Sequence, residues 1–221
     1  MTTLFGAPVA PLLDRLFTEA EVLSPLASPA FASMSPDERQ QRMRSREGYR
    51  ELYGELKEFA LPVSRETGRL LYMLARMTRA TSIVEFGTSF GLSTLHLAAA
   101  LRDNGGGRLI TTEFEPSKVA KAKANLAEAG LADLVEVREG DALTTLAADL
   151  PDMIDLLLLD GAKSLYNDIL ARVEGRLRPG AVIIADNADY CPDYLEHVGS
   201  IANGYVTMPY TDDVELSVWL G

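Results

Sequence analysis

The sequence predicts an α/β protein built on a doubly wound, mostly parallel β-sheet. Runs of aliphatic residues such as 154–159 and 181–185 have the length and composition of strands that are buried on both faces. These runs alternate with segments of helical pattern, as the β-α units of a parallel sheet do. With 221 residues, the chain is long enough to bury the core of one domain.

The first 60 residues differ in pattern from the rest and are expected to be mainly helical. Residues 9–23 indicate an amphipathic helix, and residues 24–34, rich in Ser, Pro and Ala, indicate a loop. Ser35 should begin a further helix, because it is a good N-cap, is followed by proline and stands three residues before Glu38. An apolar stripe along that helix is expected in the core or in a dimer contact rather than in a cofactor site. The stripe consists of Tyr49, Leu52, Tyr53, Leu56 and Phe59.

From residue 61 onward, helical and strand patterns alternate regularly. Ser64 is a good N-cap for the first helix of this part, and Gly130 ends the third. The last two strands should form an antiparallel hairpin at the edge of a seven-stranded sheet. The expected helices cover residues 64–77, 92–101, 116–129, 143–148, 165–177 and 192–201. The expected strands cover residues 82–86, 108–113, 134–138, 154–159, 181–185, 204–210 and 214–220.

The composition limits the partners and the location of the protein. A net charge of −11 without an uncompensated basic cluster argues against nucleic-acid and anionic-membrane partners. The arginines between residues 39 and 50 are interspersed with acids, so this segment is expected to be a solvated helix face. The single cysteine, Cys191, excludes an internal disulfide, and no apolar stretch approaches the roughly 18 residues of a membrane span. We therefore expect a soluble, cytoplasmic protein.

Polar residues end two of the buried strands. Asp160 follows the run 154–159, and Asp186 and Asn187 follow the run 181–185. Ligands of open α/β sheets bind beyond the carboxyl ends of the strands. Two carboxylates and an amide at neighbouring strand ends are hard oxygen ligands suited to Mg²⁺ or Ca²⁺. The alternative is that these residues only cap the helices that follow.

A glycine-containing loop follows the first strand, over residues 85–93. Gly87 and Gly91 allow a close approach of the backbone, and the helix that follows offers free N–H groups. The spacing is not that of a dinucleotide-binding fingerprint, and with Glu85 it suits a ligand that carries an ammonium group. Glu113 ends the second strand, where an acid can accept the hydroxyls of a ribose, and Asp141 follows the third.

Together these segments resemble the class I, cation-dependent O-methyltransferases that use S-adenosylmethionine. The resemblance is carried by residues 85–93, Glu113, residues 160–163 and Asp186-Asn187, and it extends over residues 61–221. It is closer to the catechol branch than to the caffeoyl-CoA branch. It implies one domain with a Rossmann-like seven-stranded core over residues 61–221. The helices of residues 1–60 are expected to form a lid or dimer segment, because of their apolar stripe and their position upstream of the core.

The resemblance implies a position for each part of the cofactor. The methionine part would lie against Glu85, Gly87 and Ser93. Thr88 and the backbone of Val63 would complete that end of the site.

The other end of the cofactor would lie against the next strand ends. Glu113 would hold the ribose, and Asp141 and Ala142 would border the adenine. Asp160 would contact both the cofactor and a metal ion.

The resemblance also implies the catalytic roles. Asp160, Asp186 and Asn187 would ligate Mg²⁺, or another divalent cation such as Ca²⁺ or Mn²⁺, and Lys163 would be the general base. Neighbours on a regular strand point to opposite faces, so the strand must end or bend at Asp186 for both side chains to reach one ion. Lys163 could take a proton if the cation and partial burial lower its pKa.

The expected acceptor is a small hydroxylated molecule, most simply a catechol-like phenol. Where catechol enzymes carry bulky aromatic residues, this chain has Gly161 and Ala162, which predicts a wider pocket. Asp212, Asp213 and Glu215 are all candidates to hold a second hydroxyl. Other readings are a non-aromatic acceptor such as a polyketide or sugar, and a non-catalytic nucleotide-binding module. The N-terminal helices are expected to support a homodimer.

Overall fold

The computed structural model describes residues 2–23, 25 and 28–221, and it confirms the predicted fold class. One seven-stranded sheet has the order β3-β2-β1-β4-β5-β7-β6. Strands β1 to β5 pair in parallel, whereas β7 is antiparallel to both β5 and β6, as expected of an edge hairpin. The strands are β1 (Ser82–Phe86), β2 (Arg108–Glu113), β3 (Val135–Glu139), β4 (Ile154–Leu159), β5 (Leu177–Ala185), β6 (Tyr205–Pro209) and β7 (Glu215–Trp219).

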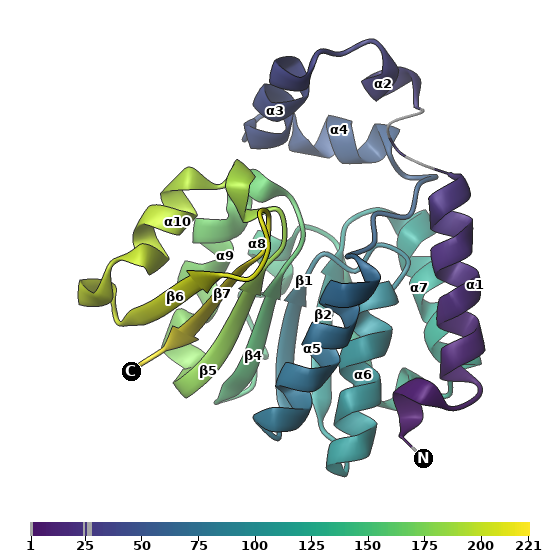
Figure 1. The fold of residues 1–221 in the computed structure, drawn as a ribbon, viewed down its shortest axis with the longest axis vertical. Helices are drawn as coiled ribbons and strands as arrows, with labels where there is room; N and C mark the ends of the chain where they lie inside the picture. The colour runs from purple at the N-terminus through teal and green to yellow at the C-terminus, as the bar shows by residue number, and fades with distance from the viewer. Residues whose placement is uncertain (1, 24, 26–27) are drawn as a thin grey trace.

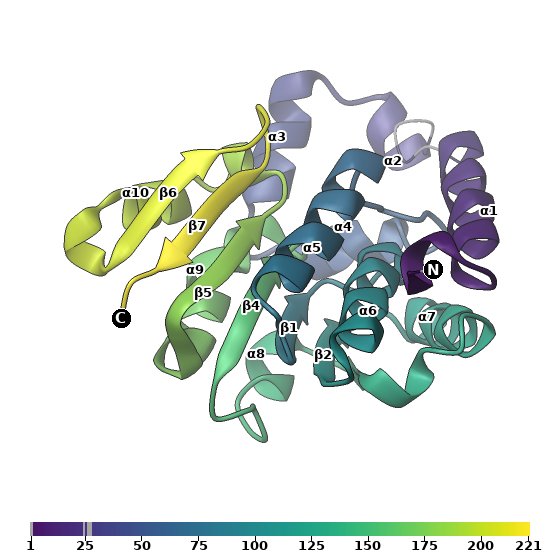
Figure 2. The same cartoon turned by 60° about the horizontal axis from the view of Figure 1, so that its bottom comes forward.

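Helices cover both faces of the sheet (Figures 1 and 2). One face packs against α5, α6 and α7, with α1 packed on α6, and the other packs against α8, α9 and α10. The helices are α1 (Val9–Val22), α2 (Pro29–Ala32), α3 (Pro36–Arg44), α4 (Tyr49–Glu55), α5 (Arg65–Met77), α6 (Leu92–Asn104), α7 (Pro116–Glu128), α8 (Ala142–Thr145), α9 (Tyr166–Val173) and α10 (Pro192–Gly199). None of the helices in the described ranges is long and apolar enough to cross a membrane.

The strands of the sheet centre are apolar on both sides because both sides are buried. Ile83 of β1 belongs to the core on the α6 side, and its neighbour Val84 belongs to the core on the α9 side. The same alternation holds in β4, where Leu156 and Leu157 face opposite cores. Burial of these side chains, each worth about 1.5–3 kcal/mol, is the main force that assembles the sheet.

The N-terminal segment differs from the prediction. The helix expected from Ser35 through the apolar stripe is broken into α3 and α4, although its predicted start is confirmed by a capping box between Ser35 and Glu38. The break follows Ser45, whose Oγ accepts from the backbone N–H of Gly48 at 3.2 Å. Part of the predicted loop 24–34 is helical as α2; Ser24, Leu26 and Ala27 of that loop lie outside the described residues.

Other boundaries moved by a few residues. The helix predicted over 165–177 ends at Val173, and β5 begins at Leu177, four residues before the predicted strand. In the N-terminal segment, α1 packs on α6 and joins the main core, whereas α2, α3 and α4 lie above the carboxyl ends of the strands (Figure 1).

The apolar stripe of α4 faces inward. Leu52 and Leu56 pack with Phe31 in a small separate cluster, as a core reading of the stripe predicts. Tyr49 and Tyr53, on the same helix, instead line a cavity above the sheet. Both tyrosines also pack against the core beneath them, so their place in the cavity wall adds to the predicted core role.

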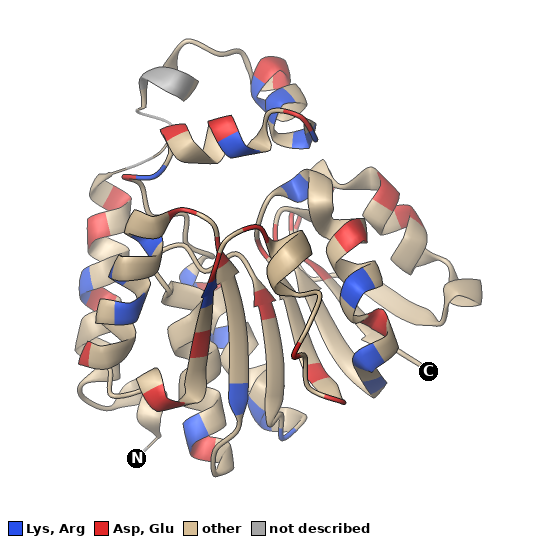
Figure 3. Cartoon of the chain, turned by 180° about the vertical axis from the view of Figure 1, so that it is seen from behind, with Lys and Arg blue, Asp and Glu red and all other residues tan. Residues whose placement is uncertain are grey.

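Three arginines of this segment are exposed, as predicted, and also attach the segment to the core. Arg44 donates to the carbonyl oxygen of Asp189 at 3.1 Å, and Arg46 forms an ion pair with Asp168. Arg50 forms an ion pair of 2.6 Å with Asp141. Figure 3 shows acidic residues at the upper ends of the strands, below the basic residues of α3 and α4.

The buried His96 predicts a pH-dependent stability. Its ring is packed against Phe17 and Gly68, and its Nδ1 lies 2.8 Å from the carbonyl oxygen of Leu92. Burial lowers the pKa of His96 to about 4, below the value of about 6.5 in an unfolded chain. The unfolded chain therefore takes up a proton first as the pH falls, and folding should lose about 3 kcal/mol between pH 6.5 and 4.

Chemical denaturation at pH 7 and pH 4.5 tests this, because the wild type should lose stability relative to His96→Gln over that interval. His197→Gln is the matched control, since the chain has two histidines and His197 is substantially exposed. An equal loss in the wild type and in His96→Gln would contradict the prediction.

Candidate functional site

The loop after β1 is held by a buried carboxylate. Glu85 is fully buried, and its two oxygens accept from Ser93 Oγ at 2.5 Å and Thr94 Oγ1 at 2.6 Å. Burial raises the pKa of Glu85 to about 6, although these hydroxyl groups, with Thr111, favour the charged form. These hydrogen bonds therefore hold the start of α6 against the end of β1.

Gly87 brings this loop against the end of β4. Its φ is +106°, and a Cβ there would meet the carbonyl oxygen of Asp160 and lie 2.7 Å from the backbone nitrogen of Gly161. The backbone N–H of Asp160 donates to the carbonyl of Phe86 at 2.8 Å. Gly87 thus allows a close approach, as predicted, and the group that it approaches is the backbone at the end of β4.

Asp160 and Asp186 end neighbouring strands at the same level. Leu159 pairs with Ala185 across β4 and β5, and the N–H of Asp186 donates to the carbonyl of Leu159 at 2.9 Å. Adjacent strands lie about 4.8 Å apart, so the two carboxylates are neighbours. Asn187 adopts a left-handed conformation with φ 51°. The strand therefore ends at this point, which is the condition for the side chains of Asp186 and Asn187 to reach one ion.

Lys163 lies beneath these acids and is buried. Its Nζ donates to Asp160 Oδ1 at 3.1 Å, to Tyr166 Oη at 2.9 Å and to the carbonyl oxygen of Asp186 at 3.2 Å. Burial by itself lowers the pKa of Lys163, but its interactions with the Tyr166 hydroxyl and the Asp160 carboxylate outweigh it and raise this pKa well above its usual value. This direction is opposite to the lowered pKa that a proton-accepting lysine requires.

The two strand-end acids are costly to ionise together. Burial and then the charge of Asp160 raise the pKa of Asp186 to about 8, and burial also raises the pKa of Asp160. A divalent cation would remove this repulsion, so the donor set fits one chemically. Across residues 2–23, 25 and 28–221, no group of three or more His, Cys, Asp or Glu side chains could hold a metal ion. The predicted ligand set, with two acids and one amide, stays a prediction.

One of the three acids near the C-terminal hairpin reaches this site. Asp213 Oδ2 accepts from Asn187 Nδ2 at 3.4 Å, and its charge contributes to the raised pKa of Asp186. Glu215 is buried and instead accepts from Thr207 Oγ1 at 2.5 Å.

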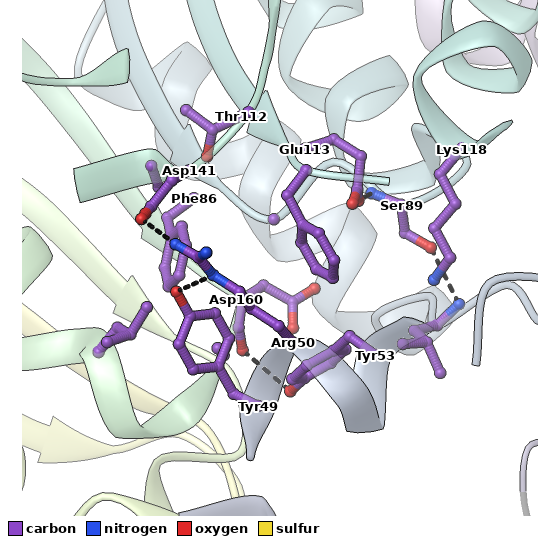
Figure 4. Close-up of a pocket in the computed structure, with 18 residues that line it drawn as sticks. Tyr49, Arg50, Tyr53, Phe86, Ser89, Thr112, Glu113, Lys118, Asp141 and Asp160 are labelled. Atoms are coloured by element: carbon purple, nitrogen blue, oxygen red, sulfur yellow. Dashed lines mark hydrogen bonds and ion pairs between the residues drawn. The ribbon is translucent and has the colours of Figure 1, made fainter. Parts of the chain in front are cut away.

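A cavity of about 290 Å³ lies above the ends of β1, β2 and β4 (Figure 4). Glu113 points toward it while its two oxygens accept from the N–H groups of Ser89 and Glu115, at 2.9 and 3.0 Å. Burial raises the pKa of Glu113. The predicted cofactor residues that line this cavity are Gly87, Glu113, Asp141, Ala142 and Asp160.

The structure places the other predicted cofactor residues behind the cavity wall. Val63 belongs to the hydrophobic core, and Thr88 Oγ1 lies 2.6 Å from Thr111 Oγ1. Glu85 and Ser93 are hydrogen-bonded to each other beneath the loop.

A second cavity, of about 620 Å³, lies beside the first and is bounded by the α2–α4 segment. Asp160 and Tyr53 line both cavities, and Lys163, Asp186 and Asn187 line the second. The predicted catalytic and metal-ligating residues therefore all line the second cavity, and Asp160 lines the first as well.

Comparison with known proteins agrees with this geometry. A family described as a methyltransferase domain matches residues 84–188. A catechol O-methyltransferase of Niastella koreensis is 37% identical over 131 residues, 58% of each chain. Catechol O-methyltransferase B of Danio rerio is 34% identical over 183 residues, which are 75% of this chain and 68% of that protein. The chain belongs to the class I O-methyltransferase family, in its catechol-like branch.

A solved structure supports the same assignment. The O-methyltransferase TomG of Streptomyces achromogenes, crystallised with S-adenosylmethionine, has a TM-score of 0.62 and 27% identity. The comparison covers 92% of this chain and 99% of TomG. The match to the Niastella protein spans less than two thirds of that protein's length, at 58%.

The family's strand-end pattern did not reveal every residue that lines the first cavity. Tyr49, Arg50 and Tyr53 of α4 line it opposite Glu113 and Thr112, and Lys118 of α7 lines it beside Ser89 (Figure 4). The helical spacing of the tyrosines was visible in the sequence, but no pattern distinguished a core stripe from a cavity wall. Lys118 is a single basic residue in the first turn of α7, and nothing in the sequence indicated that it would line a cavity.

Proposed function

We propose that this chain transfers a methyl group from S-adenosylmethionine to a hydroxyl group of a catechol-like phenol, with the help of a divalent cation. The observation that carries the proposal is that Asp160 lines both cavities, beside Asp186 and the buried Lys163. An acceptor in the larger cavity would meet a cofactor in the smaller one at this shared wall. Holding two reactants in line accounts for up to about 7–11 kcal/mol of rate enhancement in well-oriented systems.

Each residue has a defined task in this proposal. Glu113 and Asp141 would bind the adenosine end of the cofactor, whose reactive sulfonium supplies the methyl group. Asp160, Asp186 and Asn187 would hold the cation. Lys163 would receive the acceptor's proton at Nζ.

The proton-accepting role requires the neutral amine of Lys163. A bound divalent cation would favour the ionised form of an acceptor hydroxyl and would offset the carboxylate charge that raises the pKa of Lys163. The hydrogen bonds from Nζ to Asp160 and Tyr166 keep this atom in place.

The test is methyl transfer to a catechol and to the matched monophenol, each measured with and without EDTA. We expect transfer to the catechol, loss of activity on chelation and recovery when Mg²⁺ is restored. Activity that is indifferent to chelation would remove the cation from the proposal. Binding of S-adenosylhomocysteine without any cation binding or methyl transfer would favour a non-catalytic module.

The size of the second cavity supports an acceptor larger than a simple catechol. About 620 Å³ exceeds the needs of a simple catechol, and its α2–α4 side includes Phe31, Met43 and Leu56. This apolar wall favours an extended aromatic or polyketide acceptor over a sugar. Product mass spectrometry across these classes separates the two acceptor readings.

We also propose that residues 1–60 act in part as a lid and that the protein is a cytoplasmic homodimer without nucleic-acid or membrane partners. The lid role is supported by the position of α3 and α4 above the strand ends and by the Arg50–Asp141 ion pair. Sedimentation at micromolar concentration tests the dimer, and a monomer would contradict it.

A further inference from the structure

Lys118 is a buried lysine in the wall of the cofactor cavity. It stands in the first turn of α7, is 3% exposed, and runs alongside Ser89 toward the cavity (Figure 4). Burial of an ammonium group is unfavourable unless a partner compensates it. A lysine at so buried a position therefore requires a group that compensates its charge.

The part of the chain that the structure describes supplies no such partner. Lys118 forms no hydrogen bond or ion pair with these residues, and its Nζ lies 5.9 Å from the ring centroid of Phe90. The carboxylate of Glu113 is the nearest candidate by charge, but its two oxygens are already bound to the backbone N–H groups of Ser89 and Glu115. Burial lowers the pKa of Lys118, and the charges of Glu113, Glu115 and Asp160 counteract this.

Lys121, on the same helix, is a reference for the burial of Lys118. It lies one turn further along α7 and its Nζ approaches the same Phe90 ring, at 4.6 Å from the centroid, but it is exposed to solvent. The two lysines thus share a helix and an aromatic contact and differ in burial. Only Lys118 lines the cavity.

We propose that Lys118 binds the α-carboxylate of S-adenosylmethionine. This inference rests on the proposed function, because it takes that cofactor as the ligand of the cavity. The carboxylate is the cofactor's one anionic group, and of the two basic residues that line the cavity, Arg50 is exposed and already paired with Asp141. Lys118 is a buried cation in the same cavity wall as Glu113 and Asp160, the residues assigned to the ribose and to the reacting end. A charge-assisted hydrogen bond from Nζ would satisfy both groups.

Calorimetry with two ligands tests this assignment. S-adenosylhomocysteine carries the carboxylate, and its decarboxylated analogue keeps the adenosine and the amino group. Lys118→Met should weaken binding of S-adenosylhomocysteine by about 10- to 100-fold, the usual effect of losing a charged hydrogen bond. Binding of the decarboxylated analogue should change by less than about threefold, because it lacks the group that the lysine contacts. Lys118→Arg should restore part of the lost affinity.

Lys121→Met is the matched control and should bind both ligands as the wild type does. A thermal melt of Lys118→Met in the absence of ligand should show a cooperative transition at or above the wild-type temperature, since a buried charge is removed. An equal loss for both ligands, or no loss for either, would overturn the assignment to the carboxylate. If the wild type itself failed to bind S-adenosylhomocysteine, the proposed function would be wrong, and the inference with it.

Discussion

Asp186→Asn should raise the thermal stability of the cation-free protein while it lowers methyl transfer by on the order of 10³-fold. Asparagine has nearly the shape of the protonated carboxyl group, so it removes the repulsion between two buried acids without leaving a cavity. The same change removes half of the charge that would hold a cation. The opposite signs of the two effects distinguish a ligand residue from a structural one.

The stability gain should depend on pH. The pKa of Asp186 is raised to about 8 in the folded protein, above the value of about 3.9 in an unfolded chain. An acid with a raised folded-state pKa contributes stability at low pH and loses it as the pH rises through the folded value. Asp186→Asn should therefore resemble the wild type near pH 4 and exceed it increasingly up to pH 8.

Melting curves with EDTA and with Mg²⁺ check the stability part, and single-turnover methyl transfer checks the activity. Mg²⁺ should raise the melting temperature of the wild type and leave Asp186→Asn unchanged. Asp189→Asn is the control, because Asp189 stands three residues further along and is exposed. A variant that is less stable than the wild type in EDTA at pH 8, or that retains full activity, would contradict the prediction.

The central strands could be predicted from the sequence because their burial on both faces leaves a continuous apolar pattern. The run 82–86 and the run 154–159 became β1 and β4 with the predicted limits. Asp160 and Asp186, which directly follow β4 and β5, then indicated the edge of the sheet at which the candidate site lies, since all parallel strands end there. The position of each acid directly after its strand was enough to predict that Asp160 lies beside Asp186.

The break between α3 and α4 was not predictable because it depends on contacts distant in sequence. The helical pattern continues through residues 45–48, yet the carbonyl of Ser45 accepts from Ser164 Oγ at 3.2 Å, and Arg46 pairs with Asp168. These contacts are made only once α9 has packed on the sheet. The cavity roof formed by Tyr49 and Tyr53 follows from the same docking, so it could not be derived from helical spacing alone.

Gly87→Ala is expected to destabilise the protein by about 3–5 kcal/mol and to abolish cofactor binding. A positive φ costs a residue with a Cβ about 1–2 kcal/mol, and overlap with a neighbouring backbone adds to this. At Gly87 that Cβ would lie 2.6 Å from the carbonyl carbon of Asp160 and 2.7 Å from the nitrogen of Gly161. Neither backbone atom can move without displacing Asp160 from the wall that the two cavities share.

Gly91→Ala separates the overlap from the backbone strain. Gly91 belongs to the same loop and has φ +88°, but a Cβ there would find its nearest neighbour, the Cβ of Ala122, at an ordinary 3.6 Å. It should therefore lose only about 1–2 kcal/mol and keep most of its affinity for S-adenosylhomocysteine. Denaturant titration and calorimetry on both variants measure the difference. Equal effects at the two glycines would mean that conformational freedom alone explains them, and that the contact between the ends of β1 and β4 does not position Asp160.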